Sequence, residues 1–200
     1  MIDDSAKTCW FFIDDSNTWI EAPPAAAVGN VRVPKLTDGY RNPRPLIDIG
    51  QLVKRLSKDR SRGPVSLYGS RPSPNDSVWD AFERSRINLY IFDRNDKTAE
   101  KEINTTMTTN IIKAATRLDA TAEYNAEVKK QKANTIFVIV TSDGDMMPSI
   151  NEVLKVGIHV EIWALKSGMA PAYKQLRARH PALLSLRFLD SEAEIFDLTN

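Results

Sequence analysis

Apolar runs alternate with amphipathic segments along most of the chain. The runs at 8–14 and 135–141 read TCWFFID and TIFVIVT, and continuous apolar runs of this kind are typical of strands buried on both faces of a parallel sheet. Shorter runs at 65–70, 87–92 and 159–165 predict further strands. The sequence therefore predicts a sheet whose central strands have little contact with water.

Helical patterns lie between these strands. Apolar residues recur at helical spacing in 48–58, 78–86, 103–118, 149–157 and 170–180. Gly157 is expected just after the end of one helix, and Pro171 in the first turn of the next. The alternation of strand and helix predicts βαβ units. We therefore expect an α/β fold, a three-layer α/β/α sandwich with a central, mainly parallel sheet of five or six strands.

Length and composition indicate a single domain. The chain has 200 residues, of which 42% are hydrophobic, enough to bury one sizeable core. We expect one domain over residues 1–200. The segment 21–46 is rich in proline and interrupts the alternation, which indicates an insertion within that domain rather than a linker to a second one.

Charge and cysteine content restrict the possible partners and location. The formal net charge is +1, so any contact with a polyanion must come from a local patch. A single cysteine, Cys9, rules out a disulfide framework and favours an intracellular, cytoplasmic location. Without an apolar run near the roughly 18 residues of a membrane helix, no membrane partner is expected. A homodimer and other protein partners stay open.

Acidic residues follow two of the predicted strands. Asp14 and Asp15 end the first strand, and Asp143 and Asp145 follow the fourth. Each motif alone could be a helix cap or a turn. If the two strands are neighbours, however, the carboxylates crowd together and need a cation between them. The set of oxygen ligands favours Mg²⁺ or Mn²⁺ at Asp14, Asp143 and Asp145.

Several motifs occur in an order that resembles a known family. FIDDSN with WIEA, YGSRP, KEIN and TSDGDMMP follow one another, and a strand of the HVEIWAL type comes next. In this order they resemble the NYN domain, a branch of the PIN-like ribonucleases, from about Thr8 to about Asp190. The resemblance implies a metal-dependent endoribonuclease or an RNA-binding relative in which the first and fourth strands are adjacent. It also implies a catalytic set comprising Asp14, Asp143, Asp145 and positions 104 and 110.

Positions 104 and 110 depart from the family pattern. Asn104 and Asn110 stand in KEINTTMTTN where the family usually has aspartate. An amide brings no charge, and its NH₂ group donates where a carboxylate would accept. Natural loss of catalysis, natural tolerance of asparagine, and a deliberate double substitution are all compatible with this. A structural alternative is that Asn104 caps the helix and that Asn110 is a polar residue beside its apolar stripe.

The expected function is hydrolysis of single-stranded RNA at this acidic, Mg²⁺- or Mn²⁺-binding edge. Expected RNA-binding residues are Asn17 and Lys101, which match family positions, together with Arg71 and Ser142. Other basic or aromatic candidates for RNA contact are Arg60, Arg62, Arg94, Lys113, Trp19 and Tyr40.

Two other functions compete with the nuclease. The first is a catalytically dead NYN-like module that binds RNA or protein, for which the two asparagines are the evidence. The second is a von Willebrand A-like metal-dependent adhesion domain, based on the DDSNT and TSDG sequences. That domain requires a helix directly after the serines, whereas WIEAPPAAAVG follows here, so it is the more distant alternative.

Overall fold

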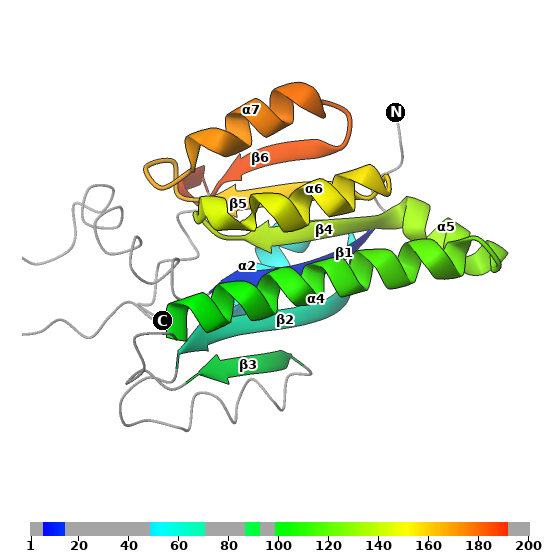
Figure 1. Ribbon diagram of the computed structural model, residues 1–200, viewed down its shortest axis with the longest axis horizontal. Coiled ribbons are helices and arrows are strands. Elements are labelled where there is room, and N and C mark those ends of the chain that lie inside the picture. Colours follow the sequence, from blue (N-terminus) through cyan, green and yellow to red (C-terminus); the bar gives the residue numbers. More distant parts are fainter. Residues whose placement is uncertain (1–5, 15–48, 71–86, 93–98, 192–200) are drawn as a thin grey trace, which may run out of the picture.

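A computed structural model describes residues 6–14, 49–70, 87–92 and 99–191 (Figure 1). These residues form one sheet of six strands with helices on both faces. The strands are β1 (Thr8–Asp14), β2 (Ser61–Ser70), β3 (Asn88–Phe92), β4 (Thr135–Val140), β5 (His159–Ala164) and β6 (Leu184–Phe188). The predicted α/β sandwich is thus confirmed. Leu184–Phe188 had no separate prediction, although a sixth strand was allowed for.

The strand order is β3-β2-β1-β4-β5-β6, and every neighbouring pair is parallel. After β1 the chain proceeds outward to β2 and β3, then returns to place β4 on the other side of β1. The order of the strands therefore reverses between β1 and β4. Such a reversal is where ligands bind in open α/β sheets, beyond the carboxyl ends of the strands.

The helices cover the sheet in two layers. They are α2 (Ile49–Ser57), α4 (Ala99–Ala122), α5 (Ala126–Asn134), α6 (Met147–Lys155) and α7 (Pro171–Arg179), with a short 3₁₀ helix η2 (Gly144–Met146) before α6. The long helix α4 lies with α6 and α7 on one face, and α2 lies behind the sheet (Figure 1). Side chains alternate along β1, so that Phe12 packs toward the α4 layer whereas Phe11 and Ile13 pack toward α2.

Helix boundaries confirm some expectations and overturn another. Gly157 follows α6 with a positive φ of 77°, and Pro171 opens α7 as predicted. Helix α4 begins at Ala99 rather than near 103, so Asn104 lies inside the helix and does not cap it. The capping interpretation of Asn104 is therefore wrong. Helix α5 was not predicted; it begins after the capping residue Asn125, whose side chain accepts hydrogen bonds from the amides of Glu127 and Val128.

Several predicted features lie outside the described residues. They are the proline-rich segment 21–46, the helix at 78–86, and the candidate contact residues Asp15, Asn17, Trp19, Tyr40, Arg71 and Arg94.

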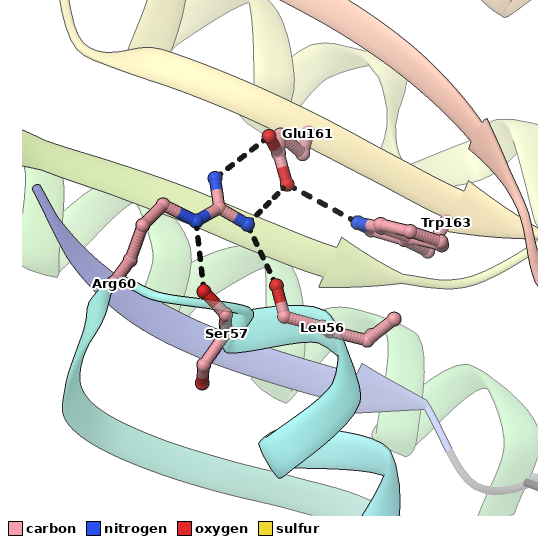
Figure 2. A network of polar contacts seen from close by, with 5 residues as sticks. All are labelled: Leu56, Ser57, Arg60, Glu161 and Trp163. Atoms are coloured by element: carbon pink, nitrogen blue, oxygen red, sulfur yellow. Dashed lines mark hydrogen bonds and ion pairs between the residues drawn. The ribbon is translucent and has the colours of Figure 1, made fainter. Parts of the chain in front are cut away.

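A largely buried ion pair connects the turn after α2 to β5, the strand next to β6 at one edge of the sheet (Figure 2). The Arg60 guanidinium contacts both carboxylate oxygens of Glu161 on β5, at 2.8 and 3.1 Å. It also donates to the backbone oxygens of Leu56 and Ser57 at the end of α2. The indole Nε1 of Trp163 donates to the same carboxylate, at 3.3 Å. Arg60 is thus committed to the core, and the expectation that it contacts RNA is wrong.

We expect Arg60→Ala to destabilise the protein by about 3–5 kcal/mol, because it leaves the buried Glu161 carboxylate and two helix-end carbonyls without their partner. Urea unfolding measures the change. The matched control is Lys155→Ala, which breaks the exposed Lys155–Glu152 pair and should cost no more than about 0.5 kcal/mol. Equal losses for the two variants would show that the Arg60 pair contributes no more than a surface pair.

Candidate functional site

The acids predicted to converge lie at the ends of two adjacent strands. The register of β1 and β4 ends with Ile13 opposite Val140. Asp14 and Thr141 are the next residues along their strands, and both are buried, at 0% and 1% exposure. Asp14 and Thr141 therefore lie at the point where the strand order reverses.

Thr141 links the two strand ends through its hydroxyl group. Its Oγ1 donates to Oδ2 of Asp14 at 3.2 Å and accepts from the backbone N–H of Asp143 at 3.1 Å. A single buried hydroxyl thus joins the acid of β1 to the turn after β4. This link fixes the position of Asp143 relative to Asp14.

The Asp143 carboxylate is held on both of its oxygens. Oδ1 accepts from the backbone N–H of Asp145 at 2.8 Å, which caps η2. Oδ2 accepts from the amide Nδ2 of Asn104 on α4 at 2.5 Å. The phenol of Tyr173 on α7 donates to the backbone oxygen of Asp143. Three separate elements therefore hold this one residue.

The negative charge of the site affects the pKa of the Tyr173 phenol. Burial raises the pKa of the Tyr173 phenol far above its usual value, and the negative charges of Asp143, Asp14 and Asp145 raise it further. The phenol is therefore protonated at all physiological pH values and acts as a hydrogen-bond donor. The three predicted acids therefore act electrostatically on one hydroxyl group.

A hollow of about 850 Å³ opens beside Asp143. We call it the carboxyl-edge hollow. Its lining comes from α4 and from the turn after β4: Glu100, Lys101, Asn104, Thr105, Thr108, Thr109, Ser142, Asp143, Gly144 and Asp145. The predicted residues Lys101 and Asp145 are exposed, and Ser142 is half-buried. Asp14 does not line the hollow and lies beneath it, connected through Thr141.

Asn110 lies apart from this hollow. Its Nδ2 donates to the Tyr68 hydroxyl at 3.2 Å, and it lines a second hollow of about 610 Å³ with Trp10, Tyr90 and Arg117. Six residues advance a helix by about 600°, or about 240° net, which turns Asn110 away from the side that carries Asn104. The two asparagines therefore do not share one site.

The donor atoms around Asp143 suit a hard cation in type. Asp14, Asp143 and Asp145 offer carboxylate oxygens, and Mg²⁺ and Mn²⁺ prefer oxygen ligands. No three His, Cys, Asp or Glu side chains in the described part of the chain are grouped to hold one ion together. The fourth oxygen, Oδ1 of Asn104, is buried and has no hydrogen-bond partner among the described residues. If the side-chain amide of Asn104 rotated, its Oδ1 could serve as a ligand for a cation.

Sequence reasoning missed two residues that shape the site. Thr141 was treated as the last residue of a strand, although a hydroxyl directly after a buried strand and before SDGD could have drawn attention to it. Tyr173 comes from α7, thirty residues after Asp143, and no local pattern indicates its contact.

Threonines on α4 form a further part of the lining. Thr105 and Thr109 donate their hydroxyl hydrogens to backbone oxygens one turn earlier, and Thr108 donates to the sulfur of Met146. Their hydroxyl oxygens retain acceptor capacity toward a ligand in the hollow. Their spacing in KEINTTMTTN was the available signal.

We expect Thr141→Val to destabilise the protein by about 1–3 kcal/mol, because Asp14 loses a donor and the amide of Asp143 loses its acceptor. Urea unfolding is the measurement. Thr141→Ser retains the hydroxyl group and is the matched control. If the valine variant is as stable as the serine variant, the hydroxyl link does not hold the two strand ends.

Burial raises the pKa of Tyr68 to about 12. Because this value lies above the ordinary value of about 10, the associated stability is present below pH 10 and is lost as the pH rises from 10 to 12. Between pH 10 and pH 12, the free energy of unfolding of wild type should fall by on the order of 2–3 kcal/mol more than that of Tyr68→Phe. Chemical unfolding at pH 10 and 12 tests this. Tyr124→Phe is the control, since Tyr124 is 89% exposed. Equal pH dependence in wild type and Tyr68→Phe would contradict it.

Comparisons with known proteins show the fold and nothing finer. No protein-family model matches the chain, and no curated protein matches it in sequence. The crystal structure of a protein of unknown function from Vibrio parahaemolyticus superposes with a TM-score of 0.55, covering 95% of this chain and 98% of that one at 12% identity. Among the described residues, no helix is long and apolar enough to span a membrane. The α/β architecture is therefore shared with a solved protein.

Proposed function

We propose that the chain is an endoribonuclease of the PIN-like, NYN type that cleaves single-stranded RNA with Mg²⁺ or Mn²⁺ at the carboxyl-edge hollow. The observation that carries the proposal is the link from Asp14 through Thr141 to Asp143 at the reversal of strand order. It brings acids from two distant parts of the chain to the place where α/β proteins bind ligands. The resemblance of the motifs to the family adds the substrate class.

The proposed roles follow from position and charge. Asp143 and Asp145, which line the hollow, would contact the cation, and the buried Asp14 would add negative charge from beneath through Thr141. The cation would supply a water of lowered pKa and neutralise phosphate charge. Lys101 is exposed on the rim of the hollow, where its ammonium group can contact a backbone phosphate. Ser142 and the α4 threonines offer hydroxyl groups to the sugar or phosphate. Asp143 keeps its orientation because Thr141, Tyr173 and Asn104 hold it.

A second function is favoured by one contact. Nδ2 of Asn104 lies 2.5 Å from Oδ2 of Asp143, so an amide hydrogen already satisfies an oxygen that a metal site needs. A protein with this arrangement could bind RNA in the hollow without cleaving it. We therefore keep RNA binding without hydrolysis as the alternative.

We expect wild type to cleave a 5′-labelled single-stranded RNA in MnCl₂ and not in EDTA. Asp143→Asn should lower the rate at least about 100-fold, because it removes a charged ligand. Glu152→Gln is the matched control: it removes one exposed acid on α6 and should leave the rate within about twofold of wild type.

Cleavage that persists in EDTA, or that Asp143→Asn leaves unchanged, contradicts the metal-dependent nuclease. RNA that wild type binds but does not cut, and that the double variant Asn104→Asp with Asn110→Asp does cut, supports the binding alternative. Duplex RNA and single-stranded DNA of the same sequence serve as competitors, and equal affinity for all three contradicts selection of single-stranded RNA.

A further inference from the structure

The amide of Asn104 donates to one of the two Asp143 oxygens and competes with a cation for it. Nδ2 lies 2.5 Å from Oδ2, and two oxygens at that separation would repel each other unless a proton or cation lay between them. The nitrogen therefore faces the carboxylate. An ion at Oδ2 would meet the positive side of this NH₂ group, so the amide opposes the ion.

The oxygen of the same amide, unlike its nitrogen, has no partner in the part of the chain that the structure describes. Oδ1 of Asn104 is buried and has no hydrogen-bond partner among the described residues. A buried carbonyl without a partner is unfavourable. A rotation of the amide by about 180° exchanges the two ends, which would direct the oxygen toward an ion beside Asp143 and remove the competing donor.

We propose that Asn104 is a positioning residue that takes the place of a cation at Asp143 and must turn over before an ion binds. This inference rests on the proposed cation site. Without an ion, the Asn104–Asp143 hydrogen bond holds α4 against the turn after β4, and in the ion-bound protein Oδ1 of Asn104 is a ligand. Asn104 therefore lowers the affinity of the site for the ion. It also stabilises the site when no ion is bound, because its amide donates to Asp143.

The first test compares Asn104→Asp with Asn110→Asp in the full chain, by titration with Mn²⁺ followed by EPR of the free ion. Aspartate at 104 removes the donor and adds a charge, so Mn²⁺ affinity should rise about 10- to 100-fold. Asn110→Asp makes the same substitution on the same helix beside Tyr68 and should leave the affinity unchanged. Unchanged affinity in Asn104→Asp, or an equal rise in both variants, overturns the proposal.

Thermal unfolding is the second readout. In EDTA, Asn104→Asp should have a lower Tm than wild type, because two carboxylates then face each other, and MnCl₂ should restore it. The Tm of wild type should change little between EDTA and MnCl₂. A variant that is equally stable in EDTA and in MnCl₂ contradicts a bridging ion.

Asn104→Ala separates competition from simple ligation. If the amide mainly competes with the ion, its removal leaves Mn²⁺ affinity equal to or above that of wild type. If Asn104 is only a ligand through Oδ1, affinity falls, and the proposal is overturned. These measurements use no RNA. If wild type cleaves RNA but the Asn104 variants bind Mn²⁺ with wild-type affinity, only the role of Asn104 is contradicted. If the Mn²⁺ affinities change as predicted but the protein does not bind RNA, only the nuclease proposal is contradicted.

Discussion

The parallel pairing of β1 with β4 is the constraint on which the candidate site depends. Because Ile13 lies opposite Val140, Asp14 and Thr141 leave the sheet side by side and the Thr141 hydroxyl reaches both Asp14 and the amide of Asp143. A slip of one residue in either strand would turn these side chains to opposite faces. Every position of β4 is buried, so a slip would require the core to repack on both faces of the sheet. A fully buried strand therefore positions the acidic residues of the candidate site.

The site also depends on how its negative charge is balanced. Asp14 is fully buried, and Asp143 takes hydrogen bonds from a backbone amide and a side-chain amide. The phenol of Tyr173 adds a third donor at the backbone of Asp143. Asn104 thus stabilises the site without an ion, whereas aspartate at the same position would place two carboxylates against each other.

The fold was more predictable from sequence than the site. Strands such as 135–141 and 159–165 were found because strands buried on both faces need uninterrupted apolar residues. Helix α5 was missed because its AEVKKQKAN sequence has no buried residue and no apolar stripe. The start of α4 was placed too late, since Glu100, Lys101 and Glu102 are charged and exposed and do not belong to its apolar stripe. The contact of Tyr173 with Asp143 is purely tertiary and has no local signature.

The separation of the two asparagines changes what their presence means. Asn104 faces an acid, where aspartate would add like charge to Asp143. Asn110 faces a neutral phenol, and its amide partly offsets the cost of burying the Tyr68 hydroxyl. An aspartate at 110 could accept the Tyr68 hydrogen without meeting another carboxylate among the described residues that line that hollow. Replacing asparagine by aspartate therefore has two unrelated physical effects. At position 104 it adds a negative charge that a cation would have to balance, and at position 110 it changes the hydrogen-bond partner of the buried Tyr68. Of the two asparagines, only Asn104 therefore changes the charge balance at the carboxyl-edge hollow.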